Sequence, residues 1–172
     1  MKKKLLSILL ALTFVISLIG CSSSNSDNAQ EDEDKKLTYV THSASGITFE
    51  LPEEWTVETD TDDFSVTFPD GIFSISEVKM SLPKEFKFFA ETYVPQMLED
   101  MKYTVVDSYT TATYASYDAY NYEATALVQG ETAPVKLTVL HVNDKALVIL
   151  YVYQGDAYDY EAIYSHFLDS IN

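Results

Sequence analysis

Histidine and carboxylate side chains are the groups in this sequence that could do acid–base or metal chemistry. The three histidines, His42, His141 and His166, lie far apart and form neither an HxH nor an HExxH arrangement, so we expect no zinc site or other metal centre. His141 falls on the apolar face of a predicted strand, where a hydrogen-bonded core histidine is favoured over a catalytic base. The sequence therefore predicts no catalytic residue and no cofactor.

A second group of candidates lies between Tyr103 and Tyr122, where six tyrosines are mixed with small polar residues. Tyrosine offers a large contact area and a hydroxyl at small entropic cost, which suits peptides and sugars as ligands. Packing is the favoured alternative, because tyrosine has high strand propensity and aromatic cross-strand pairs stabilise sheets. If the segment carries a ligand surface, the side chains we expect in it are Tyr109, Tyr114 and Tyr117, joined by Phe88 from the preceding helix.

The only thiol of the chain belongs to Cys21, which follows Leu18, Ile19 and Gly20 at the end of an apolar run. Three lysines precede that run, which extends from residue 5 to residue 19. In a helix these residues would rise by about 22 Å, short of the ~30 Å of hydrocarbon that a permanent span must cross. A basic start, a short apolar core and a small residue before the cleavage point favour a cleaved leader over an uncleaved membrane helix.

Residues 1–20 resemble a bacterial lipoprotein signal peptide, with Leu18, Ile19 and Gly20 as the residues recognised for processing. This resemblance implies that Cys21 receives a diacylglycerol thioether and becomes the mature N-terminus. Two acyl chains hold a protein in a membrane far more firmly than one chain does. We therefore expect a protein anchored by lipid to the extracytoplasmic face of the cell membrane, with no thiol left for a disulfide or for catalysis.

Composition separates a tether from a folded domain. Residues 22–36 contain no aromatic or large aliphatic side chain, so residues 21–36 are predicted to be the lipidated cysteine and a disordered acidic tether. From Leu37 on, the sequence holds 22 acidic residues and six lysines, and the whole chain lacks arginine. This composition excludes nucleic acid as a partner. The lipid on Cys21 is then the expected membrane contact, and the other partner is an unknown protein, peptide or glycan.

The remainder, residues 37–172, has the length of one domain and begins with a pattern typical of strands. Apolar residues alternate with polar ones over 47–51, 64–68 and 72–80, which predicts three strands. Helical spacing follows over 86–101, in a segment that Pro95 should kink or split because proline lacks a backbone donor. The first half of the domain is therefore predicted to be strands followed by one interrupted helix.

The second half alternates again over 120–128, 135–142 and 145–153, with Asn143-Asp144 suited to a tight hairpin turn. A helix should close the chain over 160–171, with Asp156, Asp159 and Glu161 capping its start. Residues 146–153 are apolar at every position, so that strand should be central and covered on both faces. The sequence thus predicts an α+β fold, a three-layer α-β-α sandwich around an antiparallel sheet.

This order of elements resembles the PsbP-like fold. The resemblance rests on a G-x-x-F-x-x-P-x-x-W start, formed by Gly46, Phe49, Pro52 and Trp55, and on the ending Phe167-Leu168-Asp169-Ser170-Ile171. The family includes an extrinsic photosystem II subunit, a nuclear-transport factor and many bacterial lipoproteins. It implies that residues 37–172 are a PsbP-like domain that acts as a binding or assembly adaptor, and it transfers no functional residue.

We accordingly expect a non-catalytic binding or assembly module on a lipid anchor. Two alternatives stay open: a surface hydrolase with unrecognised catalytic residues, and an accessory subunit of a membrane complex. A deep pocket with His141 or paired carboxylates would favour the hydrolase, whereas a shallow face lined by tyrosines would favour binding.

Overall fold

The computed structural model describes residues 37–59, 63–80 and 83–172. The signal peptide, Cys21 and the tether, all predicted within residues 1–36, lie outside these ranges. Residues Tyr39–Asn172 form one compact unit, which contains every helix and strand of the described ranges.

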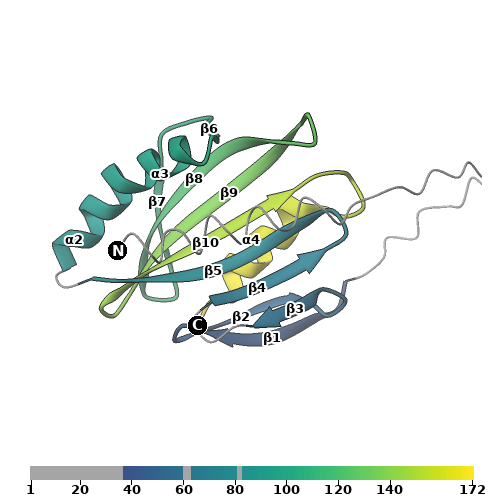
Figure 1. Ribbon diagram of the computed structural model, residues 1–172. Coiled ribbons are helices and arrows are strands. Elements are labelled where there is room, and N and C mark those ends of the chain that lie inside the picture. Colours follow the sequence, from purple (N-terminus) through teal and green to yellow (C-terminus); the bar gives the residue numbers. More distant parts are fainter. Residues whose placement is uncertain (1–36, 60–62, 81–82) are drawn as a thin grey trace, which may run out of the picture. The chain divides into compact units, whose positions relative to one another are not determined.

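An antiparallel sheet runs through the described part of the domain, with the strand order β3-β4-β5-β10-β9-β8-β6 and with β7 also paired to β8 (Figure 1). Its strands, in chain order, are β3 (Thr56–Thr59), β4 (Asp63–Phe68), β5 (Gly71–Lys79), β6 (Thr104–Val105), β7 (Thr110–Tyr114), β8 (Tyr117–Val128), β9 (Glu131–Val142) and β10 (Lys145–Tyr153). β10 lies between β5 and β9, and all its side chains from Ala146 to Tyr153 are buried. The predicted central position of this segment is confirmed.

Helices cover the two faces of the sheet. Neighbouring residues on a strand point to opposite faces. On one face of β8, the Tyr122 hydroxyl donates to the carbonyl of Ala90, which belongs to the helical segment over residues 83–100. On the other face, Asn121 accepts a bond from Thr138, and the Thr138 hydroxyl also bonds Tyr164 of α4 (Tyr160–Ser170). The helical segment over residues 83–100 and α4 therefore lie on opposite sides of the sheet, as Figure 1 shows. The predicted α-β-α layering is confirmed.

The first helical layer is split into α2 (Pro83–Phe88), a π-helical segment η2 (Phe89–Tyr93) and α3 (Val94–Asp100). The Val94 amide reaches the Phe89 carbonyl, five residues back. Pro95, which has no amide to donate, falls in the first turn of α3, where the missing donor is tolerated. The interruption that proline predicts is confirmed, and its form is a π turn.

The spacing of the buried residues gives a physical reason for that turn. Phe86, Ala90, Val94 and Leu98 are buried and follow one another at intervals of four. In a straight α-helix a four-residue step advances about 40° around the axis, so a long row of such steps leaves the buried face. A π turn holds more residues than an α turn. The wider turn at η2 therefore keeps the row against the sheet.

A two-stranded sheet shares the other face with α4. Its strands are β1 (Tyr39–Ala44) and β2 (Ile47–Pro52). The Phe49 ring of β2 packs edge-on against Phe167 of α4, with 5.4 Å between ring centroids, and also contacts Phe73 of β5. The predicted strand at 47–51 exists, but it joins this separate hairpin, and the hairpin together with α4 forms the third layer.

The end of the chain is fastened to the same hairpin. Thr48 and Asn172 exchange two backbone hydrogen bonds, of 2.9 and 3.0 Å. Nearby, the Glu50 amide donates to the Ser170 hydroxyl at 2.8 Å. Backbone groups on the edge of β2 that does not pair with β1 thus form hydrogen bonds with residues 170–172.

Candidate functional site

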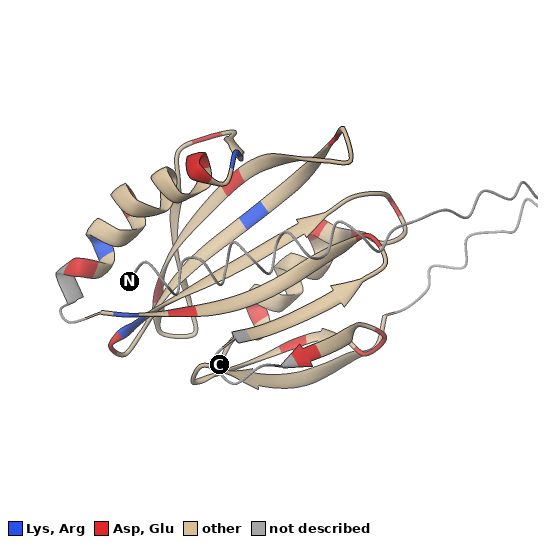
Figure 2. Cartoon of the chain, in the orientation of Figure 1, with Lys and Arg blue, Asp and Glu red and all other residues tan. Residues whose placement is uncertain are grey.

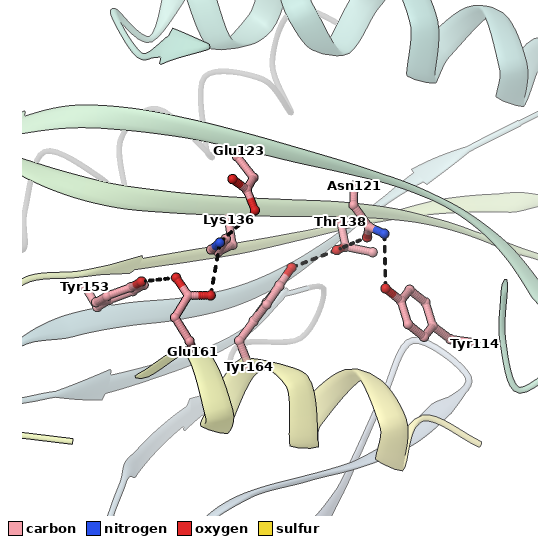
Figure 3. A network of polar contacts seen from close by, with 8 residues as sticks. All are labelled: Tyr114, Asn121, Glu123, Lys136, Thr138, Tyr153, Glu161 and Tyr164. Carbon is pink, nitrogen blue, oxygen red and sulfur yellow. Dashed lines mark hydrogen bonds and ion pairs between the residues drawn. The ribbon is translucent and has the colours of Figure 1, made fainter. Parts of the chain in front are cut away.

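Two polar clusters lie on opposite faces of the sheet. The first, which we call the α4 network, comprises Tyr114, Asn121, Glu123, Lys136, Thr138, Tyr153, Glu161 and Tyr164 (Figure 3). The second, the Glu91 cluster, comprises Lys87, Glu91, Tyr109 and Tyr120.

In one part of the α4 network, Lys136 forms ion pairs with two glutamates. Its ammonium group lies 2.8 Å from Glu123 and 3.1 Å from Glu161, which in turn accepts the Tyr153 hydroxyl at 2.5 Å. Burial on its own would lower the pKa of Lys136, but the hydrogen bonds to Glu123 and Glu161 outweigh it and raise that pKa. The lysine therefore stays protonated, whereas a nucleophilic or basic lysine needs a lowered pKa.

The other part of the α4 network is a series of hydrogen bonds that begins at the buried Tyr164 hydroxyl. The hydroxyls of Tyr164 and Thr138 are 2.7 Å apart, Thr138 donates to the Asn121 carbonyl oxygen at 2.6 Å, and the Asn121 amide donates to Tyr114 at 3.1 Å. Thr138 has no exposed surface. A buried chain in which each member has a partner fixes one helix position on the sheet. The α4 network is accordingly an attachment of α4 to β8, β9 and β10 (Figure 3).

The Glu91 cluster lies where the sheet edge is interrupted. After β6, the Val106 amide bonds the Glu123 carbonyl, and pairing with β8 resumes only at Thr110, opposite Asn121. The released segment carries Tyr109, whose ring packs on Tyr120 with a centroid distance of 5.0 Å. The break in the edge strand therefore brings Tyr109 against the helix that carries Glu91.

Three groups converge on one oxygen of Glu91. Its Oε1 accepts the Tyr109 hydroxyl at 2.8 Å and the Tyr120 hydroxyl at 3.4 Å, and the Lys87 ammonium is 3.6 Å away. The hydrogen bond to Glu91 raises the pKa of Tyr109, and burial followed by the Glu91 charge raises the pKa of Tyr120. Both phenols therefore remain donors at neutral pH and hold the carboxylate in place.

Phe88 adds exposed aromatic surface to the same helical layer. It is 65% exposed and lies three residues before Glu91 in the chain. An exposed phenylalanine on the layer that carries a fixed carboxylate adds apolar surface to charged surface, and such a combination suits a binding contact.

The four tyrosine and phenylalanine residues predicted from sequence are not brought together. Tyr109 belongs to the Glu91 cluster, and Phe88 belongs to the first helical layer. Tyr114 and Tyr117 face each other across the β7–β8 hairpin, and Tyr114 belongs to the α4 network on the other face of the sheet. A ligand surface made of all four is therefore not formed. Tyr109 bonds Glu91 of the helical layer to which Phe88 also belongs.

Sequence reasoning missed Glu91 and Tyr120. The alternation of the strand places Tyr120 on the apolar face, and its ring does contact Phe86, but its hydroxyl reaches Glu91. The spacing of Lys87 and Glu91, four residues apart on a predicted helix, was the available signal, since such pairs meet on a helix surface. Nothing local connects either residue to Tyr109.

The three histidines lie against different partners. His141 stacks on Phe86 with 4.6 Å between centroids, and His42 packs beside Phe49 and Phe64, where burial lowers its pKa. His166 lies 2.8 Å from a carboxylate oxygen of Glu50, and its ring contacts Tyr39 of β1 at a tilt. His141 is half-buried and packs against an aromatic ring of the first helical layer.

The serine nearest to the His166–Glu50 pair is already engaged. Ser170 accepts the Glu50 amide and donates its own proton to the Phe167 carbonyl at 2.7 Å. A serine nucleophile would have to donate that proton to a base. This serine, histidine and carboxylate therefore do not form a charge-relay arrangement.

Neither a metal-ligand cluster nor a membrane-spanning helix occurs among the described residues. In residues 37–59, 63–80 and 83–172, no three or more histidine, cysteine or acidic side chains gather as metal ligands would. Within the same part of the chain, no helix combines the length and the apolar character needed to cross a membrane.

Comparisons with known proteins identify the fold. No protein family model matches the chain, and no curated protein sequence matches it. The solution structure of the cyanobacterial PsbP, CyanoP, from Synechocystis sp. PCC 6803 is similar, with a TM-score of 0.61, 10% identity, and 90% of this chain and 98% of that chain covered.

The crystal structure of the Ran-binding protein Mog1p from Saccharomyces cerevisiae is similar as well. Its TM-score is 0.51 at 10% identity, with 80% of this chain and 96% of that chain covered. At sequence identities this low, the similarity shows only that the helices and strands are arranged in the same way. With helices on both sides of an antiparallel sheet, the chain has the α+β architecture of the PsbP-like fold.

Proposed function

We propose that this chain is a lipid-anchored, extracytoplasmic module that binds a protein partner and is not itself catalytic. The observation that carries the proposal is the surface formed by Phe88 and the Glu91 cluster. The Phe88 ring is largely exposed, and two phenols hold the Glu91 carboxylate of the same helical layer in position. Interfaces use such anchors, because a fixed side chain loses little entropy when it binds.

The polar groups that could have been catalytic support the same proposal. Lys136 is held in its charged form by two glutamates, and the Ser170 proton is donated to a backbone carbonyl. These arrangements stabilise the fold, and they leave each group without the activated form that catalysis requires. Mog1p, one of the proteins with a similar fold, is described as a Ran-binding protein, and binding is accordingly the class of function that we assign.

The anchor is the second part of the proposal. Cys21, preceded by Leu18, Ile19 and Gly20, would carry the lipid, and residues 22–36 would separate the domain from the membrane. The acidic domain itself is repelled by anionic lipid. In this proposal the lipid provides the membrane contact and the folded domain provides the protein contact.

Site-specific photocrosslinking in intact cells of the host tests the binding function. A photoreactive phenylalanine analogue replaces Phe88 in one variant and Thr41, an exposed residue of β1, in a control variant. We expect position 88 to capture the same protein in repeated experiments and position 41 not to capture it. Capture of the same set of proteins from both positions, or of none from position 88, would contradict the proposed function.

A further inference from the structure

The Glu91 carboxylate has one oxygen that the cluster leaves unused. Every hydrogen bond and ion pair described for Glu91 involves Oε1, and Oε2 takes part in none of them. The side chain is 28% exposed. The two phenols thus fix the carboxylate while its second oxygen can accept a bond from outside, which is the preorganised geometry that strengthens binding.

The ion pair already present is weak enough to be exchanged. Lys87 is 3.6 Å from Glu91 and 70% exposed, and exposed pairs of this kind contribute about 0–1 kcal/mol. An incoming cation therefore competes with a loosely held ammonium group. By contrast, Lys136 and Lys145 each lie 2.8 Å from a glutamate.

The surroundings of Glu91 favour a guanidinium over an ammonium group. The Tyr109 ring lies beside the carboxylate, because its hydroxyl bonds Oε1 of Glu91. A planar guanidinium stacks on such a ring while its N–H groups bond an oxygen at the edge. A lysine offers a compact, strongly hydrated charge that stacks less well.

The charge of the chain selects a basic partner. The formal net charge is −16, and the sequence contains no arginine. Figure 2 shows acidic residues, coloured red, spread over the helices, strands and loops, and few basic residues, coloured blue. Complementary charge steers association and suppresses wrong partners. The negative charge of the chain as a whole would attract any basic protein, and Glu91 would bind one side chain of that protein.

Building on the proposed function, we infer that Glu91 receives an arginine side chain from a basic segment of the protein partner. The guanidinium bonds Oε2 of Glu91 and stacks against Tyr109. Lys87 is displaced into solvent. The unused oxygen, the adjacent tyrosine ring and the acidic charge of the chain together define this contact.

Binding of a defined peptide to the full chain, purified in detergent, tests the inference. The probe is a flexible peptide with three arginines separated by glycine and serine. One comparison peptide has citrulline in place of arginine, which keeps the shape and removes the charge, and another has lysine. Affinities are measured by isothermal titration calorimetry at low salt.

We expect the arginine peptide to bind, the lysine peptide to bind more weakly and the citrulline peptide not to bind. Glu91→Gln should weaken arginine binding about ten-fold or more. Glu99→Gln is the matched control, because Glu99 is exposed on the same helical layer and its loss changes the net charge equally.

Equal weakening by Glu91→Gln and Glu99→Gln would overturn the inference, since it would reveal attraction by general charge alone. Equal binding of the lysine or citrulline peptide, or no binding of the arginine peptide, would overturn it too. If crosslinking at position 88 still captures one protein under any of these results, the inference fails and the proposed function stands. Absence of capture at position 88 counts against the proposed function.

Discussion

Tyr151 and Tyr164 stack with their ring planes 2° apart and their centroids 5.2 Å apart, yet their hydroxyl groups are in opposite situations. The Tyr164 hydroxyl is 2.7 Å from that of Thr138 in the α4 network. The Tyr151 hydroxyl is buried and has no hydrogen-bond partner among the described residues. The hydroxyl groups of two tyrosines in contact in one core are thus expected to make opposite contributions to the free energy of unfolding.

Removing each hydroxyl should reveal this difference. Tyr164→Phe leaves the buried Thr138 hydroxyl with one partner fewer and should lower the free energy of unfolding by about 1–3 kcal/mol. Tyr151→Phe removes an unpaired buried group and should raise it by up to about 1 kcal/mol. Urea denaturation followed by circular dichroism measures both values, and each variant is the control for the other. A loss from Tyr151→Phe as large as that from Tyr164→Phe would show that Tyr151 has a partner.

Buried tyrosines also make the domain sensitive to alkaline pH. Burial raises the pKa of Tyr103 from 10.0 to about 12 and raises the pKa values of Tyr122, Tyr151 and Tyr164 as well. Each of these groups binds its proton more tightly in the folded state. Their contribution is complete below about pH 10, the pKa of an unfolded tyrosine, and is lost as pH rises through the folded-state pKa.

We therefore expect stability to fall steadily above about pH 10, by about 1.4 kcal/mol per pH unit for each tyrosine ionised only in the unfolded chain. Urea midpoints measured as a function of pH, with tyrosinate absorbance recorded in parallel, test this expectation. Tyr103→Phe should make the decline less steep. A flat profile up to about pH 12 would contradict the burial of these phenols.

Gly71 is required by a close approach of two chain segments. A Cβ added there would lie 2.2 Å from the Val152 carbonyl oxygen and 2.5 Å from the Phe68 ring. Because the first contact is with backbone, Gly71→Ala should destabilise the fold by about 3 kcal/mol. Gly46→Ala is the comparison, since Gly46 has φ +93° but nothing within 4 Å of an added Cβ; its cost should be roughly 1 kcal/mol. Equal effects in thermal denaturation would show that packing at Gly71 is unimportant.

The proposed anchor is tested at Cys21. Replacing it with serine removes the thiol that lipid attachment requires. The expected product is a larger precursor without lipid, detected by mass spectrometry and by its failure to incorporate a labelled fatty acid. The neighbouring substitution Ser22→Ala should leave processing unchanged. Normal maturation and membrane retention of Cys21→Ser would contradict the lipoprotein assignment.

Sequence periodicity was sufficient for the layers of the fold. The apolar run from Ala146 to Tyr153 correctly predicted a central strand, and Asp159 caps α4 by accepting the Ala162 amide, as expected of an acidic residue at a helix start. The repeated four-residue spacing of Phe86, Ala90, Val94 and Leu98 is wider than the period of an α-helix and so indicates a π turn. Proline alone indicated where the helix would be interrupted.

The site could be predicted only in part, because its contacts join residues from separate elements. Composition indicates Tyr109 as a candidate, and the position of Phe88 off the buried helix face indicates Phe88. Glu91 accepts a bond from Tyr109 because residues 107–109, between β6 and β7, leave the ladder with β8. Strands of two and five residues have too short a pattern to be predicted from alternation. Composition therefore presents the tyrosine-rich segment as one surface, whereas the sheet divides it between two faces.

The pairing of Thr48 with Asn172 would give a mechanical load a path through the domain. If Cys21 carries the proposed anchor, a pull on it would enter the domain at β1, which is paired to β2, and β2 is bonded in turn to Asn172, which follows α4. Tension would therefore pass through the hairpin into α4, on the face of the sheet opposite Glu91. A module held by its N-terminus at a moving membrane could in this way bear force while the surface offered to a partner keeps its shape.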